Sequence, residues 1–219
     1  MIQTIDGTNV HLHREMLRSF SALRYEIFIK QLGWKIPRCV NGLEEDQFDD
    51  DNAIYLIATN SCGDVVGGTR LLDTSRRSLL GEIFPHLVDG PVPADPRIFE
   101  VTRFAVAPRH QRADDHVNVC MELLWGLQAF GISAGLTHYV SVSHIALEPL
   151  LRRAGYRFRR LGGVIKMDGS RIAALQHDVL VTALEQSHAR LSVPSSISYS
   201  RFEHLRQTDA TRWGLEGGR

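Results

Sequence analysis

The segment Ile98–Pro108, IFEVTRFAVAP, decides the fold of this 219-residue chain. Its β-branched and aromatic residues are typical of a strand that is buried on both faces, and Pro108 ends the run. Glu100 and Arg103 interrupt it, and charged side chains are seldom buried unless they are paired. The segment therefore predicts a central strand that borders polar groups, and we expect a functional site there.

The spacing of Glu100 and Arg103 leaves two alternatives open. In a regular strand these two side chains point to opposite faces, because the side-chain period is two. Either they serve different sides of the sheet, or a β-bulge near Val101 and Thr102 turns one of them.

The composition excludes several classes of protein. Lys and Arg number 25 and Asp and Glu also number 25, so no net charge attracts nucleic acid or an anionic membrane. No apolar run approaches the ~18 residues of a membrane span, and the N-terminus lacks the pattern of a secretory signal. The cysteines, Cys39, Cys62 and Cys120, are odd in number and far apart, which favours reduced thiols in the cytoplasm.

The domain organisation is expected to be simple. No Pro/Ser/Gly-rich linker divides the chain, which predicts one domain over residues 1–195. The polar residues 196–219 are expected to form a loosely ordered tail.

Hydrophobic periodicity predicts helices and strands that alternate around the central strand. The expected strands are 2–5, 53–58, 65–72, 137–143, 156–161, 164–167 and 171–178, and the expected helices are 11–32, 78–84, 116–134, 144–154 and 180–191. The acidic segment 36–52 is expected to be irregular, with Phe48 as its anchor. This order predicts an α/β (α+β) fold, a three-layer αβα sandwich around a mixed twisted sheet, as in GNAT-like acyltransferases.

The polar residues show no nucleophile elbow and no metal-ligand spacing. The turn at 109–114 also lacks the glycines that hold the pyrophosphate of acetyl-CoA in GNAT enzymes, which counts against ordinary acetyl-CoA binding. Two interpretations of the remaining polar and aromatic residues stay open. They form an ion-pair network that holds the acidic loop to the sheet, or a cleft for a zwitterionic or cationic ligand with an apolar body. The residues concerned are Arg24, Phe28, Trp34, Asp46, Asp49, Arg70, Phe84, Glu100 and Arg103.

Several motifs resemble those of the LuxI-type acyl-homoserine-lactone synthases, which make quorum-sensing autoinducers. They are LRYEIFIKQLGW (23–34), EEDQFDDD (44–51), VVGGTRLL (65–72), EIFPHL (82–87), FEVTRFAV (99–106) and YVSVSHIALEPLLRRAGYRFRRLG (139–162). The resemblance covers about residues 1 to 165. It implies a GNAT-like fold and a reaction in which the amine of S-adenosylmethionine takes an acyl group from a thioester. The lactone then closes and methylthioadenosine leaves.

The resemblance also implies the roles of the site residues. Glu100 is the expected general base, acting directly or through a water. The adenosylmethionine pocket and its ion-pair cluster are expected to comprise Arg24, Phe28, Trp34, Asp46, Asp49, Arg70, Phe84, Arg103 and Phe104. S-adenosylmethionine is expected as a substrate, with no further cofactor and no metal.

The acyl group is expected in a tunnel lined by Leu123, Leu127, Val140 and Val142. Family members that use 3-oxoacyl chains tend to carry a threonine at the Val140 position, so we expect an acyl group without a 3-oxo substituent. A basic patch, Arg152, Arg153, Arg157, Arg159 and Arg160, suits either an acyl carrier protein or the phosphates of coenzyme A, and an ordinary solvated helix end equally well. The alternative function is an inactive relative that only binds S-adenosylmethionine or an acyl carrier.

Overall fold

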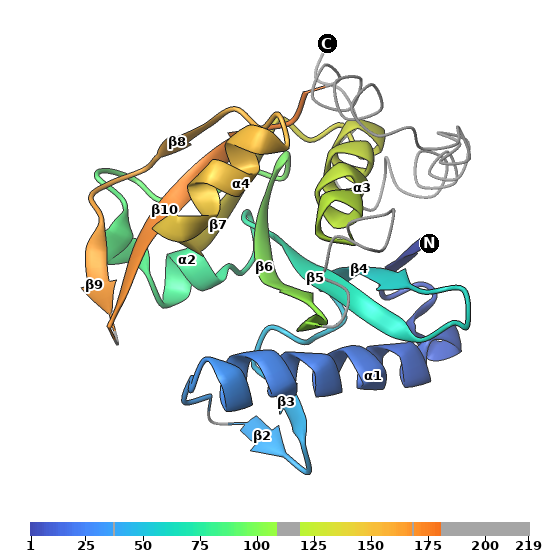
Figure 1. Ribbon diagram of the computed structural model, residues 1–219. Helices are drawn as coiled ribbons and strands as arrows, with labels where there is room; N and C mark the ends of the chain where they lie inside the picture. The colour runs from blue at the N-terminus through green and yellow to red at the C-terminus, as the bar shows by residue number, and fades with distance from the viewer. Residues whose placement is uncertain (37, 109–118, 168, 181–219) are drawn as a thin grey trace. The chain divides into compact units, whose positions relative to one another are not determined.

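The computed structural model, drawn in Figure 1, describes residues 1–36, 38–108, 119–167 and 169–180. The chain forms two compact units. Unit 1 contains Met1–Leu72 and Val101–Gly126, and unit 2 contains Asp73–Glu100 and the chain from Leu127 onward. Strand β6 (Ile98–Val106) and helix α3 (Val119–Ser133) each pass from one unit into the other. Each unit is therefore described with its own part of these two elements.

The sheet of unit 1 is antiparallel where its register is known. Strand β1 (Ile2–Ile5) pairs with β4 (Ile54–Thr59), which pairs with β5 (Val65–Asp73), and β6 follows β5 in the strand order. The predicted strands 2–5, 53–58 and 65–72 are confirmed to within one residue.

Helices cover both faces of the unit 1 sheet. A Cβ atom on Gly68 would lie 2.8 Å from the Phe20 ring of α1 (Arg14–Arg24). A Cβ atom on Gly67 would lie 3.1 Å from the side chains of Val119 and Leu123 in α3. Adjacent residues of a strand face opposite ways, so α1 and the first part of α3 sandwich this sheet. The two glycines allow the helices this close approach.

The expected helix 11–32 is divided into three segments. A short 3-10 turn, η1 (Val10–Leu12), precedes α1, and α1 continues directly into the π-helix η2 (Tyr25–Gln31). Gly33 follows with a φ of 69°, in the left-handed region that favours glycine, and the helix ends there as predicted.

The prediction that segment 36–52 is irregular is wrong at its start. Strands β2 (Arg38–Val40) and β3 (Leu43–Glu45) form a hairpin beside α1 in Figure 1. Its turn is Asn41-Gly42, with φ values of 54° and 77°, and Asn-Gly is the strongest short signal for such a turn. The acidic composition of the segment obscured this signal. The expected anchor is confirmed, because Phe48 is buried.

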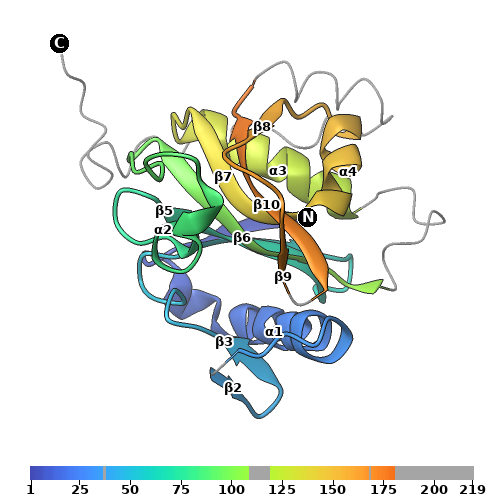
Figure 2. The same cartoon turned by 90° about the vertical axis from the view of Figure 1, so that its left-hand side faces the viewer.

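Unit 2 contains a mixed sheet, in which β6, β7 and β10 are neighbours (Figure 2). Residues Ile98–Glu100 of β6 pair in parallel with β7 (His138–His144), and β7 pairs antiparallel with β10 (Ser170–Asp178). Strands β8 (Phe158–Arg160) and β9 (Ile165–Met167) both pair with β10. The predicted strands are confirmed here, although β8 is shorter than expected.

The two faces of the unit 2 sheet also carry different helices. The Tyr139 hydroxyl donates a hydrogen bond to the Leu127 carbonyl of α3 at 2.6 Å. The next residue, Val140, packs in a core cluster with Leu80 of α2 (Leu79–Glu82) and Leu87 of η3 (Pro85–Leu87). Helix α3 and helix α2 therefore lie on opposite faces of this sheet.

The remaining helix of unit 2 is α4 (Glu148–Arg153), preceded by η5 (Ile145–Leu147) and ended before Gly155, whose φ is 83°. Together these match the predicted helix 144–154. The predicted helix 180–191 and the predicted tail lie outside the described residues, apart from residue 180. Within the described parts of the chain, no helix is both long and apolar enough to cross a membrane.

Candidate active site

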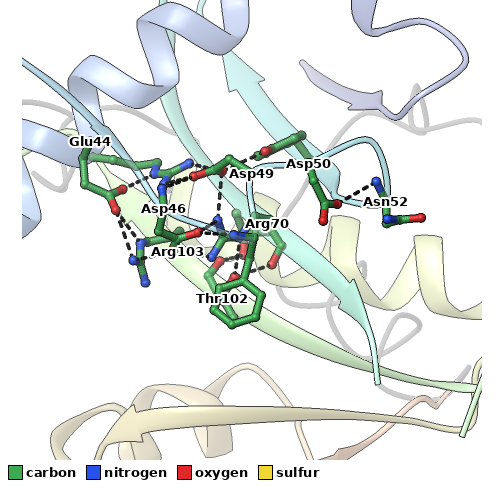
Figure 3. Close-up of polar contacts among 12 residues, drawn as sticks. Glu44, Asp46, Asp49, Asp50, Asn52, Arg70, Thr102 and Arg103 are labelled. Atoms are coloured by element: carbon green, nitrogen blue, oxygen red, sulfur yellow. Dashed lines mark hydrogen bonds and ion pairs between the residues drawn. The ribbon is translucent and has the colours of Figure 1, made fainter. Parts of the chain in front are cut away.

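Six charged side chains gather in unit 1 into one network, which we call the ion cluster (Figure 3). Its members are Arg24, Glu44, Asp46, Asp49, Arg70 and Arg103, and their side chains are at most 12% exposed. Three guanidinium groups face three carboxylates, so the formal charges cancel. A buried network of this kind is tolerable only because every charge has partners.

Arg24, at the end of α1, ties two segments of the acidic region together. Its two terminal nitrogens each donate to one oxygen of Asp49 at 2.8 Å. Its Nε donates to Glu44 of β3. The Asp49 carboxylate also accepts from the Tyr55 hydroxyl, 2.8 Å away, which links the loop to β4.

Arg70 and Arg103 bring the neighbouring strands to the same network. Arg70 donates to both oxygens of Asp46, at 2.6 and 3.0 Å, and to the Thr102 hydroxyl at 3.1 Å. Arg103 donates to Asp46 at 2.6 Å and to Glu44 at 3.1 Å. The ion cluster therefore pins the acidic loop to β5 and β6.

The backbone of β6 explains how Arg103 reaches the cluster. Arg103 has a φ of 52°, a left-handed conformation that is unusual for a residue other than glycine. The side chains of the consecutive residues Thr102 and Arg103 both contact the cluster, which a regular strand would not allow. Of the two alternatives left open by the sequence, a local irregularity of β6 is therefore present, but it is centred on Arg103 and not on Val101 and Thr102.

The network changes the acidity of its members. Burial alone would raise the pKa of Asp46, but its hydrogen bond and attraction to Arg70 outweigh burial and lower that pKa. Asp49 behaves in the same way with Arg24 as its main partner, and its pKa lies well below the ordinary value. Burial opposes the charge on Arg24 and Arg70, yet their carboxylate partners raise both pKa values. All four groups are held in their charged forms.

An aromatic pair lies next to the cluster. The rings of Phe28 and Trp34 stack with their centroids 4.7 Å apart and their planes 13° from parallel. The Arg103 guanidinium carbon lies 5.7 Å from the Phe28 ring centroid and 5.9 Å from that of Trp34. Phe28 is buried, whereas Trp34 is 45% exposed. The π-helix positions this pair, because the Trp34 N–H donates to the Phe28 carbonyl just beyond it.

Glu100 occupies unit 2 and is fully buried. Its Oε1 accepts a hydrogen bond from the Leu80 N–H at 2.9 Å, at the N-terminus of α2. The Ser78 hydroxyl caps the same helix through the Gly81 N–H. Glu100 pairs in register with Val140, so both side chains lie on the α2 face of this sheet.

Of the residues predicted to line the acyl tunnel, Leu127, Val140 and Val142 belong to unit 2 and Leu123 belongs to unit 1. Val142 packs against the cluster that contains Val140, and so does Phe84, which was predicted for the adenosylmethionine pocket. Leu127 belongs to α3, on the other face of the unit 2 sheet. Leu123 packs in a unit 1 core cluster, together with Phe104.

The predicted carrier patch lies on α4 and β8 and in the turn between them. Arg152 and Arg160 share the buried carboxylate of Glu148, at 3.2 and 2.7 Å. Arg157 pairs with Asp178 at 3.3 Å, and Arg159 donates to Gln176. Among the residues that the structure describes, Arg152, Arg157 and Arg160 of this patch each pair with a carboxylate.

The sequence reasoning missed three members of the unit 1 site: Glu44, Tyr55 and Thr102. Glu44 is fully buried and bridges Arg24 and Arg103. The signal that could have placed it in a strand is the Asn41-Gly42 turn, because in β3 Glu44 is buried and Glu45 is exposed. Within the described residues, no group of three or more His, Cys, Asp or Glu side chains is placed to hold a metal ion.

Comparison with solved structures defines the class of protein. Two acyltransferases, a putative N-acetyltransferase from Lactobacillus plantarum and an acyl-CoA N-acyltransferase from Pseudomonas aeruginosa, share the fold with TM-scores of 0.55 and 0.52 at 13% and 16% identity. A CoA-dependent acyl-homoserine lactone synthase, BjaI, solved with SAM and isopentyl-CoA, matches with a TM-score of 0.81 and 31% identity, over 89% of this chain and 90% of that one. The expected GNAT-like α/β fold is confirmed, and the chain is an acyltransferase.

Comparison of sequences defines the family. The autoinducer synthase family model matches residues 9–186. The isovaleryl-homoserine lactone synthase of Bradyrhizobium diazoefficiens is 31% identical over 90% of this chain and 88% of its own length. The acyl-homoserine-lactone synthase of Acinetobacter nosocomialis is 32% identical over 80% of this chain and 98% of its own. The chain therefore belongs to the autoinducer synthase family.

Proposed function

We propose that this protein is an acyl-homoserine-lactone synthase that transfers an acyl group from a thioester to the amine of S-adenosylmethionine. The methionyl carboxylate then closes the lactone and expels methylthioadenosine, and the lactone serves as a quorum-sensing signal. The observation that carries the proposal is the neutral ion cluster beside the Phe28–Trp34 stack, in a chain of the autoinducer synthase family.

The aromatic pair and the ion cluster of unit 1 are of the kinds that bind a positively charged substrate such as S-adenosylmethionine. An aromatic face attracts a sulfonium or stacks on adenine, and Trp34 is exposed enough to meet a ligand. The ion cluster keeps Arg103 fixed against both rings. We assign Arg24, Phe28, Trp34, Asp46, Asp49, Arg70 and Arg103 to this S-adenosylmethionine site, and we add Glu44, Tyr55 and Thr102 as residues that hold it in place.

Glu100 is the proposed general base, directly or through a water. An α-amino group titrates near ~8, so freeing it at pH 7 costs only about 1 to 1.5 kcal/mol. Val140, Val142 and Phe84, which share a core cluster on the Glu100 face, are the proposed neighbours of the acyl chain. Leu123 and Leu127 stay predicted neighbours of the same chain.

The remaining assignments follow from the same reaction. Neither acyl transfer nor lactone closure oxidises or reduces a substrate, so no redox cofactor is needed. S-adenosylmethionine is proposed as a substrate, and no further cofactor is proposed. We place the reaction in the cytoplasm, because Cys39, Cys62 and Cys120 are all free thiols. The basic patch of α4 and β8 is proposed to receive the acyl carrier, either acyl carrier protein or coenzyme A.

Substitution of Glu100→Gln tests the catalytic assignment. Glutamine keeps an oxygen that can accept from the Leu80 N–H, but it cannot take a proton. We expect single-turnover acyl transfer to slow by at least about 10²-fold while S-adenosylmethionine affinity is unchanged. Ser78→Ala, which removes the other side-chain cap of α2, is the matched control for damage to that helix. An unchanged single-turnover rate in Glu100→Gln would show that Glu100 is not the general base.

The product spectrum tests the function itself. Culture medium from a bacterium that expresses the chain is extracted and analysed by mass spectrometry for the homoserine-lactone fragment. We expect lactones without a 3-oxo group, because Val140 offers no hydroxyl. Comparison of the purified enzyme on one acyl chain, carried by coenzyme A or by acyl carrier protein, identifies the carrier. A medium without any lactone would favour an inactive binding protein instead.

A further inference from the structure

A segment of unit 2 crosses the face of the sheet that carries Glu100. At its start, the Leu80 N–H donates to Oε1 of Glu100 in β6 at 2.9 Å. At its end, the Asp89 N–H donates at 2.8 Å to the carbonyl oxygen of Leu161, the residue after β8. The strands lie in the order β6-β7-β10-β8, so this segment passes from the first of these strands to the last. We call residues 80–89 the crossing segment.

The crossing segment is held close to the sheet. A Cβ atom on Gly162 would lie 2.5 Å from the Leu87 carbonyl oxygen, so the backbone of the turn after β8 already touches the segment. Leu80 and Leu87 are each only 1% exposed and pack in one core cluster with residues of the sheet. Because hydrogen bonds hold both ends, the space beneath the segment depends on the side chains of the sheet.

The sheet side chains beneath the crossing segment differ in size at one position. Val140 pairs in register with Glu100, and Val142, two residues along β7, points to the same face. Ala174 of β10 lies directly opposite Val142 and therefore shares this face. Among the described members of the cluster, all are leucine, isoleucine, valine or phenylalanine except Ala174, which is fully buried. The smallest side chain beneath the segment is thus on β10.

Sheet geometry gives the position of Ala174 relative to Glu100. Two strand spacings of ~4.8 Å and two residues of ~3.3 Å each separate them, which places Ala174 about 12 Å from Glu100 along the sheet. The crossing segment begins at Glu100 and runs in the same direction, over β7 and β10. An acyl chain whose carbonyl lies at Glu100 would follow this path toward Ala174.

We propose that Ala174 sets the upper limit on the length of the acyl chain that the enzyme accepts. The inference rests on the proposed function and names a substrate feature of the same site. A chain that ends before Ala174 does not meet this residue, whereas the end of a longer chain has to fit between it and the crossing segment. A larger side chain at this position therefore excludes long chains selectively. One methylene group in an apolar pocket changes selectivity by about 10- to 200-fold.

Substitution of Ala174→Val tests the proposal. The kcat/KM of wild type and variant is measured with S-adenosylmethionine and a series of straight-chain thioesters from butanoyl to dodecanoyl. We expect the variant to transfer the longest chain that the wild type accepts about tenfold more slowly or worse, and butanoyl less than threefold more slowly. An equal loss for every chain length would overturn the inference.

The matched control is Ala173→Val. Ala173 is also fully buried, and it lies opposite Ser143, so it faces α3 on the other side of the sheet. The added methyl groups overpack the core there as they do at Ala174. The ratio of long-chain to short-chain transfer should nevertheless stay at the wild-type value. The same change of ratio in both variants would assign the effect to general packing and overturn the inference.

A binding measurement separates this inference from the proposed function. S-alkyl thioethers of pantetheine cannot transfer an acyl group, and they contain the arm that coenzyme A and acyl carrier protein share. Isothermal titration calorimetry should show a loss of affinity in Ala174→Val that is confined to the longer alkyl chains. This loss would support the role of Ala174 even if the wild type formed no lactone, a result that contradicts only the proposed function. Affinities that do not change with the substitution at any chain length would overturn the inference.

Discussion

Glu44 joins two arginines of the ion cluster that come from different elements. It is fully buried and is the only described carboxylate that pairs with both Arg24 and Arg103, so it links the end of α1 to β6. Arg103 in turn adopts a left-handed backbone conformation and contacts the Phe28–Trp34 pair. A strained backbone persists only where its surroundings determine it, and the carboxylates of the cluster supply that restraint.

Substitution of Glu44→Gln should destabilise the protein strongly. It leaves three guanidinium groups facing two carboxylates in a buried site, and removal of one partner from a buried ion pair costs about 3 to 5 kcal/mol. We expect a loss of this size in the free energy of unfolding, measured by urea denaturation. The matched control is Glu45→Gln, one residue further along β3, where the side chain is exposed. A similar effect of both substitutions would contradict the importance of the network.

Strand β5 shows how a single element positions two helices. Its Gly67 and Gly68 let α3 and α1 approach opposite faces, and Arg70, two residues later, enters the ion cluster from the α1 side. The closeness of α1 matters for the site because α1 ends at Arg24 and leads into the π-helix that holds Phe28.

Substitution of Gly68→Ala tests this helix–sheet contact. The added methyl group would lie 2.8 Å from the Phe20 ring and 3.0 Å from the Leu56 carbonyl oxygen, so something must shift. Overpacking of a core typically costs about 1 to 3 kcal/mol, and we expect a lower thermal midpoint together with weaker S-adenosylmethionine binding. Gly163→Ala is the control, because nothing lies within 4 Å of the added atom there. Wild-type stability in Gly68→Ala would show that α1 adjusts freely.

For the whole molecule, His177 should make folding stability depend on pH. Its pKa falls from 6.5 to about 4 on folding, so below pH 6.5 the unfolded chain binds more protons than the folded one. The contribution of neutral His177 to the free energy of unfolding is fully present above about pH 6.5. It declines as the pH falls toward 4, by about 3 kcal/mol in total. Urea denaturation at several pH values measures this decline.

His177→Phe removes the titrating group and should flatten the curve between pH 6.5 and 4. His11→Phe, which removes an exposed histidine, should keep the wild-type dependence. A wild-type slope that survives in His177→Phe would assign the effect to other groups.

Local patterns were sufficient for most of the secondary structure and for the family. Periodicity located the strands to within one or two residues apart from the β2–β3 hairpin and the shorter β8, and the motifs around Arg24, Asp46, Arg70 and Arg103 indicated a synthase of this type. Such features are encoded by neighbouring residues, which is why they can be predicted from the chain alone.

Other features arise only when distant segments pack together. Glu44 looked like part of a solvated acidic run, but the Asn41-Gly42 turn and β3 bury it against arginines from two different elements, α1 and β6. The left-handed φ of Arg103 is imposed by those partners and not by its neighbours in sequence. Likewise, Tyr139 and Val140 are neighbours in sequence, and the sheet of unit 2 directs them to helices on opposite faces. Burial and charge pairing depend on contacts between residues far apart in the chain, so only the folded protein fixes them.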